Sequence, residues 1–166
     1  KLIVLNCPHP RRFLDGFADP GQWLRSAYIG FFQLPWLPEW VLQADDYQFV
    51  DRVFDQLAVN RRAITAIDIQ AFKTALARPG ALQASLNYYR NLLSSSVLQQ
   101  TWPVLAVPTL MIWGEDDPVF ASALATAEEH VREFHLRYIA HCGHWVPQEY
   151  PELVNQYMGE FLGVSV

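Results

Sequence analysis

Three short strand-like runs, and the helical stretches between them, most restrict the fold of this chain. The runs cover residues 2–5, 108–113 and 135–140. The first two are continuously apolar, which is typical of strands buried in a parallel sheet. Helices are expected over 121–134, between the last two runs, and over 151–162. A strand, a block of helices and then strand–helix–strand–helix predicts an α/β fold built on a parallel sheet.

Between the first two runs, the chain shows only helical patterning broken by proline and glycine. Helices are expected here over residues 20–33, 39–42, 47–59, 67–77 and 81–93. We therefore predict that residues 11–102 form an inserted helical domain. Residues 1–10 then form the first core strand and its loop, and residues 103–166 form the rest of the core.

The composition argues against several classes of partner. The net charge of -5 provides no basic surface, which disfavours nucleic acid. No apolar run is long enough to span a bilayer, and no signal peptide is visible. Cys7 and Cys142 make no disulfide framework, so a reducing compartment such as the cytoplasm is expected. The aromatic share of 14% is more than a small core needs and is compatible with an apolar pocket for a small hydrophobic substrate, but ordinary core packing accounts for most of it.

Polar loops follow the last two predicted strands. One reads Trp113-Gly114-Glu115-Asp116-Asp117-Pro118, and the other reads His141-Cys142-Gly143-His144-Trp145. The carboxyl ends of parallel strands meet at one edge of the sheet, where ligands bind. A carboxylate that hydrogen-bonds an imidazole fixes its tautomer, and the histidine can then act as a general base. Asp117 and His144 are therefore predicted as the acid and base of a nucleophile–histidine–acid triad, with Asp116 as the alternative acid.

A purely structural role for these loops stays open, whereas a metal site is disfavoured. Asp117 could merely begin a turn before Pro118, and His144 could be an ordinary loop residue. A metal site is disfavoured, because His141, Cys142 and His144 are too close in sequence to close a tetrahedral site, and no Cys-x-x-Cys lies elsewhere. We expect no metal and no cofactor.

The two loops resemble the acid and histidine motifs of α/β-hydrolases. Asn6-Cys7-Pro8-His9-Pro10 resembles the segment after the sixth strand in the epoxide hydrolase branch of that superfamily. The segments Phe31–Glu39 and Asn87–Asn91 are similar to cap-domain motifs of the same branch. The resemblance covers essentially the whole chain in family order, and it implies that the helical insertion is the cap.

The resemblance implies a two-step reaction. In that family an aspartate nucleophile opens an epoxide to give a covalent ester, and the histidine–acid pair activates the water that hydrolyses it. Two cap tyrosines donate hydrogen bonds to the epoxide oxygen, which develops alkoxide character. Carried over by motif, the histidine is His144, the acid is Asp117, and the tyrosines are Tyr89 and Tyr28.

The tyrosine assignments have alternatives. Tyr89 lies on the apolar face of its predicted helix and could be a core residue with its hydroxyl at the rim. Tyr88, on a different helix face, is the nearby competitor. Tyr28 is matched only by its spacing from the Phe31–Glu39 motif. Trp36 and Trp145 are predicted to line the substrate pocket.

One part of the family pattern is missing from these residues. No Gly-x-Asp-x-Gly or Gly-x-Ser-x-Gly elbow occurs, and neither does the His-Gly-x-Pro segment that forms the oxyanion hole. Both would precede Lys1 in a full-length relative. We therefore interpret the chain as the cap and the last three core strands, inactive alone, with an open edge beside the first strand.

Three other functions stay open. On the same fold, the chain could come from a haloalkane dehalogenase, which needs halide donors rather than two cap tyrosines. It could also come from a serine esterase, which needs a serine in the elbow. From another class, it could be a stand-alone binding module with a vestigial triad.

Overall fold

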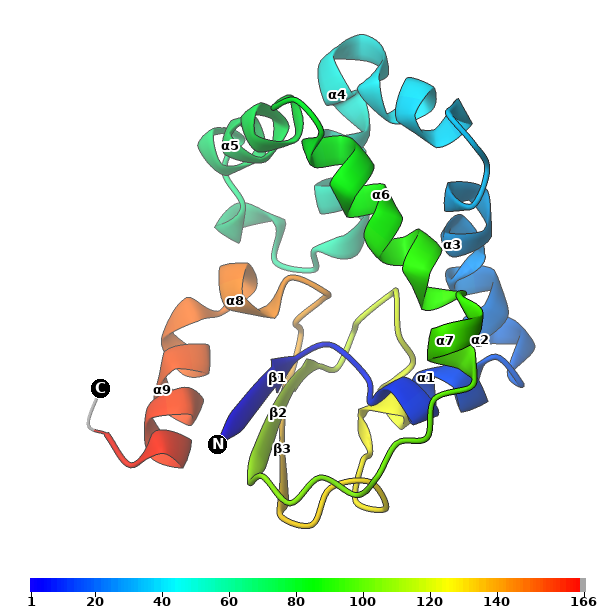
Figure 1. Cartoon of the computed structure of the whole chain (residues 1–166). Helices are drawn as coiled ribbons and strands as arrows, with labels where there is room; N and C mark the ends of the chain where they lie inside the picture. The colour runs from blue at the N-terminus through cyan, green and yellow to red at the C-terminus, as the bar shows by residue number, and fades with distance from the viewer. Residues whose placement is uncertain (165–166) are drawn as a thin grey trace. The chain divides into compact units, whose positions relative to one another are not determined.

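The predicted parallel α/β sheet is confirmed by a computed structural model, which describes residues 1–164. The strands are β1 (Leu2–Leu5), β2 (Thr109–Gly114) and β3 (Phe134–Ile139), and they lie in the order β1-β2-β3 (Figure 1). Both pairings are parallel. The carboxyl ends of the strands therefore lie at the same edge of the sheet.

The chain divides into two compact units. Unit 1 consists of Lys1–Arg25, Leu57–Ala63 and the chain from Trp102 onward, and it holds the three strands. Unit 2 consists of Ser26–Gln56 and Ile64–Thr101 and is helical. The domain boundaries at residues 10 and 102 stay a prediction.

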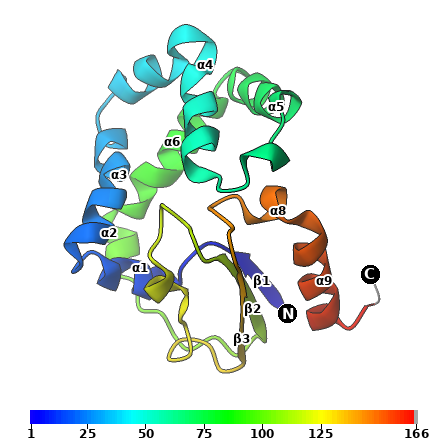
Figure 2. The ribbon, with the colours of Figure 1, turned by 180° about the vertical axis from the view of Figure 1, so that it is seen from behind.

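Helices cover one face of the sheet in unit 1. These are α8 (Val146–Glu149) and α9 (Pro151–Leu162), and α9 spans the residues predicted for it. Leu110, Ile112 and Ile139 of the sheet form a buried cluster with Val154 of α9, and four further α9 side chains pack against it. Figures 1 and 2 show α9 beside one face of the strands. The regular apolar face of α9 explains why its bounds could be predicted.

The other face of the sheet is covered by shorter elements. The 3₁₀ helix η2 (Ser122–Ala125) contributes Leu124 and Ala125 to a cluster with Met111 and Trp113 of β2. Helix α1 (Pro10–Gly16) packs near η2, and α2 (Pro20–Arg25) follows it. Because both faces of β2 are covered and both its edges are paired, every residue of β2 is buried.

Two sequence-based expectations about unit 1 are wrong. First, residues 121–134 do not form a helix, because η2 ends at Ala125 and Thr126 is extended. The backbone beyond it pairs with Leu105, which donates to His130 O and accepts from Arg132 N, each at 2.9 Å. Backbone groups that bond another segment cannot also form an α-helix. Second, the apolar run of β1 is typical of a strand buried on both sides, but Leu2 is 40% exposed. Among the described residues β1 pairs only with β2, so its other edge is unpaired.

Unit 2 is built from helices around a small apolar core. They are α3 (Ala27–Phe32), most of α4 (Leu37–Leu57), α5 (Ala66–Leu76), α6 (Ala81–Leu92) and α7 (Ser95–Leu98). Leu42, Leu82 and Leu86 form the buried cluster. Two helices are divided or joined differently from the expectation. A break at Ser26 divides the helix expected over 20–33 into α2 and α3. Helix α4 joins two expected segments across a left-handed turn at residues 45–47.

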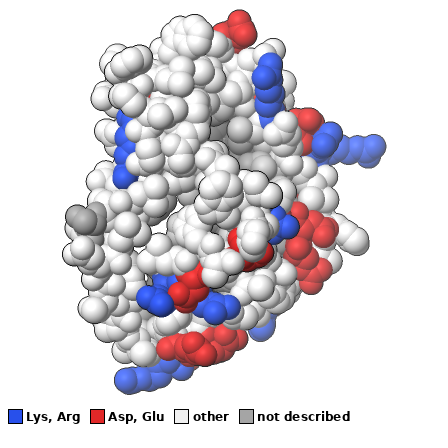
Figure 3. Space-filling model, turned by 90° about the vertical axis from the view of Figure 1, so that its right-hand side faces the viewer, with Lys and Arg blue, Asp and Glu red and all other residues white. Residues whose placement is uncertain are grey.

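The charged side chains on one face of the surface are mixed in sign, and the described helices are short or polar. Acidic and basic side chains alternate over the lower part of the face shown in Figure 3, and much of that face bears neither. Within residues 1–164, no helix combines the length and apolarity that a membrane crossing needs.

Candidate active site

The predicted acid and histidine meet at the carboxyl edge of the sheet. Asp117 follows β2 and His144 follows β3, and Asp117 Oδ2 lies 3.0 Å from His144 Nδ1. The Asp117 side chain has no exposed surface, whereas that of His144 is 23% exposed. A carboxylate can only accept here, so Nδ1 carries the hydrogen and Nε2 is left as the basic nitrogen.

The local backbone holds Asp117 in place. Its Oδ1 accepts from the backbone N–H of Val119 at 2.7 Å and of Phe120 at 3.3 Å. Oδ2 accepts from Asn6 Nδ2 at 2.9 Å as well as from His144. The competing acid, Asp116, is exposed and lies 3.8 Å from His141 Nδ1. The geometry therefore favours Asp117 as the partner of His144.

A buried carboxylate, Glu149, anchors the histidine loop. Glu149 is 3% exposed, and its oxygens accept backbone N–H groups on both sides of His144, from Gly143 at 3.1 Å and from Trp145 at 3.2 Å. They also accept from Val59 at 3.0 Å and Asn60 at 2.8 Å. Glu149 therefore ties the loop to the segment after α4.

Sequence analysis did not identify Glu149 or Asn6 as site residues. Glu149 follows Pro147 in a short helix and reads as an ordinary surface acid. Asn6 belongs to the Asn6-Cys7-Pro8-His9-Pro10 segment, but nothing in the sequence pattern distinguishes its side chain. The contacts of both residues are made mainly with segments distant in sequence, which local patterns do not report.

A glycine in each motif permits a close backbone contact of the histidine loop. A Cβ on Gly114 would press against the Gly143 carbonyl oxygen and lie 2.6 Å from Cys142 O. A Cβ on Gly143 would press against Leu57 O and lie 2.9 Å from Val59 N. Neither backbone can accommodate a side chain, so Gly114 is required for the approach of the acid loop to the histidine loop, and Gly143 for the approach of the histidine loop to residues 57–59.

Aromatic rings flank His144 in unit 1. The Trp145 ring lies edge-on to the imidazole with centroids 5.3 Å apart, and the Phe120 ring lies at 5.9 Å. Trp145 is half-buried. Its predicted contact with substrate stays a prediction, as does the role of every site residue named from the sequence.

The two predicted tyrosines are neighbours within unit 2. Tyr28 of α3 and Tyr89 of α6 have ring centroids 5.6 Å apart at 80°, and the Phe32 ring contacts both. Both tyrosines are half-buried, whereas Tyr88 is 66% exposed. Burial, with a smaller contribution from Tyr88, raises the pKa of Tyr89. Tyr89 therefore keeps its phenolic hydrogen at neutral pH and can donate a hydrogen bond.

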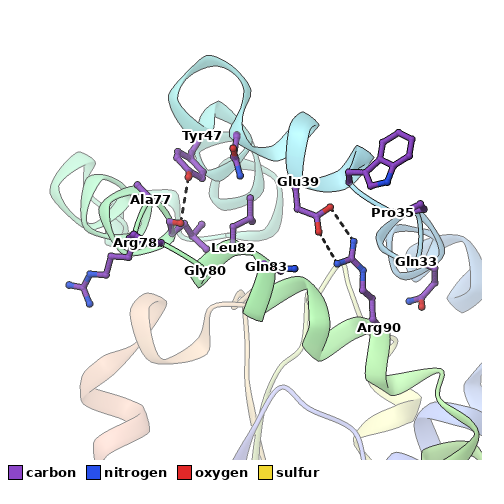
Figure 4. Close-up of a pocket in the computed structure, with 14 residues that line it drawn as sticks. Gln33, Pro35, Glu39, Tyr47, Ala77, Arg78, Gly80, Leu82, Gln83 and Arg90 are labelled. Carbon is purple, nitrogen blue, oxygen red and sulfur yellow. Dashed lines mark hydrogen bonds and ion pairs between the residues drawn. The ribbon is translucent and has the colours of Figure 1, made fainter.

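Contacts between the two cap motifs explain why these tyrosines are adjacent. Arg90 Nη1 and Nη2 bind the two oxygens of Glu39 at 2.8 and 3.1 Å (Figure 4). The same guanidinium donates to Phe32 O at 2.9 Å and to Leu34 O at 3.0 Å. Gln33 Nε2 donates to Tyr89 O at 3.3 Å. These bonds join α6 to the segment after α3.

Trp36 lines an open groove of about 740 Å³ in unit 2. Tyr28 and Tyr89 are not among the residues that line this groove. The side chain of Trp36 is 79% exposed and its φ is 50°. The charged pair in this groove, Glu39 with Arg90, is mutually satisfied, as Figure 4 shows. That Trp36 contacts substrate stays a prediction.

The described residues offer little for other chemistry. Among residues 1–164, no group of three or more His, Cys, Asp or Glu side chains is placed to hold a metal ion. Cys142 is fully buried, and burial, with nearby carboxylates, raises the pKa of its thiol to about 12. A thiol with this pKa is a poor nucleophile at neutral pH.

A family model described as the alpha/beta hydrolase family matches residues 2–157. The chain belongs to the α/β hydrolase family. The expected resemblance to its epoxide hydrolase branch is also confirmed by similarity over nearly the whole chain. Human epoxide hydrolase 4 is 33% identical over 169 residues, which is 98% of this chain and 46% of that protein. The AB hydrolase superfamily protein YfhM of Bacillus subtilis is 38% identical over 98% of this chain and 57% of that protein.

Solved structures agree with this placement of the α/β hydrolase chain. A crystal structure of the epoxide hydrolase from Bacillus megaterium in complex with an inhibitor superposes with a TM-score of 0.80 at 28% identity, covering 98% of this chain and 60% of that one. The chain spans about half the length of the curated relatives it matches.

Proposed function

We propose that this chain carries the acid, the base and the oxygen-binding tyrosines of an epoxide hydrolase, which converts an epoxide and water to a vicinal diol. The observation that carries the proposal is the Tyr28–Tyr89 pair, whose ring centroids lie 5.6 Å apart on α3 and α6. The acid–histidine pair suits several α/β hydrolases, but two adjacent phenols suit one developing alkoxide. The similarity to epoxide hydrolases supports the same activity.

In the first step, an aspartate outside these residues attacks an epoxide carbon. The carbon–oxygen bond of the ring breaks as the ester bond forms, and the oxygen takes the electron pair. Hydrogen bonds from the Tyr28 and Tyr89 hydroxyls stabilise this oxygen, and one of the two phenols passes it a proton, which gives the alcohol and a phenolate. The tyrosines therefore lower the barrier of alkylation.

In the second step, water hydrolyses the ester. His144 Nε2 takes a proton from water as its oxygen attacks the ester carbonyl. The imidazolium that forms is stabilised by Asp117, whose Oδ2 lies 3.0 Å from Nδ1. The ester carbon–oxygen bond breaks, and the leaving diol oxygen takes the proton from the imidazolium, which returns His144 to its neutral form. The regenerated aspartic acid gives up its proton, which restores the phenol. Loss of His144 therefore affects only this step.

We propose further that the chain is inactive alone, because none of its 166 residues forms a nucleophile elbow motif. Residues 11–102 would act as the cap over a small hydrophobic substrate, with Trp36 and Trp145 among its contacts. The low cysteine content favours the cytoplasm as its compartment. A haloalkane dehalogenase, a serine esterase and a non-catalytic binding module are the alternatives to be tested.

The nucleotide sequence upstream of Lys1 is the first test. An open reading frame that continues into a Gly-x-Asp-x-Gly elbow supports the proposal. A Gly-x-Ser-x-Gly elbow there would favour an esterase, and a start codon directly before Lys1 would favour a binding module.

The decisive experiment is to trap the intermediate. The His144→Gln variant of the protein with its upstream half is mixed with styrene oxide, and its intact mass is measured. We expect a stable mass increase of one epoxide. His135→Gln, an exposed histidine, is the matched control and should turn over without accumulating ester. Normal turnover by His144→Gln would refute the assignment of the base.

A further inference from the structure

The side chain of Asn6 lies at the junction of the three loops that follow the strands. Asn6 comes directly after β1 and is 4% exposed. Its φ is 40°, in the left-handed region that asparagine tolerates better than most residues. The left-handed backbone ends β1 and starts the loop that leads to α1.

The Asn6 amide is fully hydrogen-bonded. Oδ1 accepts from Gly114 N at 2.7 Å. Nδ2 donates to Asp117 Oδ2 at 2.9 Å and to Gly143 O at 2.9 Å, with a longer contact to His144 O at 3.3 Å. One side chain therefore holds the end of β2, the acid, and the backbone beside the histidine.

We infer that Asn6 is a positioning residue for the acid–histidine pair. The oxygen that it contacts, Asp117 Oδ2, is the same oxygen that lies 3.0 Å from His144 Nδ1. By holding Asp117 Oδ2 and the Gly143 carbonyl together, the amide aligns that oxygen with Nδ1. This alignment selects the Nδ1–H tautomer of His144 and leaves Nε2 as the base. The catalytic consequence rests on the proposed function, but the effect on the tautomer does not.

Neither aspartate nor leucine meets the same requirements at this position. Aspartate has the shape and the tolerance of a left-handed backbone, but it would place a second oxygen against Asp117 Oδ2 and Gly143 O, where donors are needed. Leucine would leave Gly114 N and Gly143 O without their partner. An amide supplies an acceptor and two donors without adding charge.

The first test reads the tautomer of His144 directly. Long-range ¹H–¹⁵N NMR spectra of the whole chain at neutral pH distinguish the Nδ1–H from the Nε2–H form. We expect the wild type to be predominantly Nδ1–H. Asn6→Gly removes the amide but allows the left-handed backbone, and Asn6→Asp keeps the shape but removes both donors. Both variants should shift His144 towards the Nε2–H form that free histidine prefers.

The control separates positioning from stability. Asn155 is exposed in the middle of α9, so Asn155→Gly destabilises the chain without touching the site. This variant should keep the wild-type tautomer. If folded Asn6→Gly and Asn6→Asp chains also kept it, the inference would be overturned. If both Asn6 variants failed to fold, Asn6 would be required for folding rather than for positioning, and the inference would again be overturned.

The second test measures catalysis in the protein that includes the nucleophile. In Asn6→Gly, hydrolysis of the ester should slow on the order of 10-fold to 100-fold, because a displaced base loses its alignment. Formation of the ester should be unchanged. An equal loss in both steps, or none in hydrolysis, would overturn the inference. If His144→Gln trapped no ester, the proposed function would fail while the tautomer result still decided the role of Asn6.

Discussion

The rings of Tyr28 and Tyr89 stand nearly perpendicular, at 80°, with their centroids 5.6 Å apart. The two residues belong to different helices, α3 and α6, which the contacts of Arg90 and Gln33 join. Neither residue's position follows from its own sequence neighbourhood. The pair depends on the packing of α3 and the segment after it against α6.

The tyrosine pair predicts a specific loss in the first chemical step. Tyr28→Phe or Tyr89→Phe should slow ester formation by about 10² to 10³, because each removes one donor to the developing alkoxide. Single-turnover measurement of the alkyl-enzyme in the protein that includes the nucleophile tests this. The exposed Tyr88→Phe variant is the control and should react at the wild-type rate. Undiminished ester formation in the double variant would exclude these tyrosines.

Glu149→Gln should destabilise unit 1 by roughly 2–3 kcal/mol. The carboxylate accepts four backbone N–H groups at 2.8–3.2 Å, and an amide NH₂ would face some of these donors instead. Urea unfolding measures the change in free energy. The exposed Glu152→Gln in the first turn of α9 is the control and should change it far less. Equal effects of the two variants would contradict the anchoring role of Glu149.

The Glu39–Arg90 pair predicts an acid-sensitive contribution to the stability of unit 2. The hydrogen bond with Arg90 is the largest cause that holds the pKa of Glu39 below its ordinary value. The stability that the Glu39–Arg90 pair contributes is therefore complete above the ordinary glutamate pKa of about 4.3. It is lost as the pH falls through the lower pKa that Glu39 has in the folded chain. Thermal unfolding of wild type and Glu39→Gln should differ at pH 7, and the difference should shrink as the pH falls below about 4.3 and through the folded pKa of Glu39.

The exposed Glu129→Gln is the control for that measurement, since Glu129 belongs to unit 1 and the ion pair to unit 2. Its unfolding temperature should track the wild type at every pH. A Glu39→Gln variant that showed the same pH profile as the wild type would mean that the ion pair contributes nothing measurable.

His9 predicts a loss of stability at mildly acidic pH. It caps α1 by accepting from Arg11 N at 3.2 Å, and its ring stacks on that of His130 at 4.4 Å. Burial, and then the nearby His130, lower the pKa of His9. The unfolded chain therefore takes up the proton first, so stability is full above about pH 6.5 and falls as the pH drops towards the folded pKa.

Melting temperatures between pH 7.5 and pH 5 test the role of His9. His9→Asn keeps a capping oxygen but does not titrate, so its melting temperature should fall less over this interval than that of the wild type. His135→Gln removes an exposed histidine and should leave the wild-type slope unchanged. If His9→Asn and wild type lost stability in parallel, protonation of His9 would not be the cause.

Local pattern was sufficient for several parts of this protein. Helix α9 has the bounds that its apolar periodicity predicts, and β2 and β3 lie within a residue of the predicted runs. The loops that carry Asp117 and His144 were identified because each directly follows a strand, and parallel strands place those loops at one edge. These features depend on residues close together in sequence.

Only the tertiary structure decided the rest. Residues 121–134 have the composition of a helix, but pairing of residues 130–132 with Leu105 displaces it. Asn6 bonds residues 108 to 138 positions away, and Glu149 bonds the backbone 89 and 90 positions away as well as its own loop. The sequence by itself determined the strands and the acid–histidine loops. The alignment of Asp117 with His144 was decided by buried hydrogen bonds between distant segments, which no local period encodes.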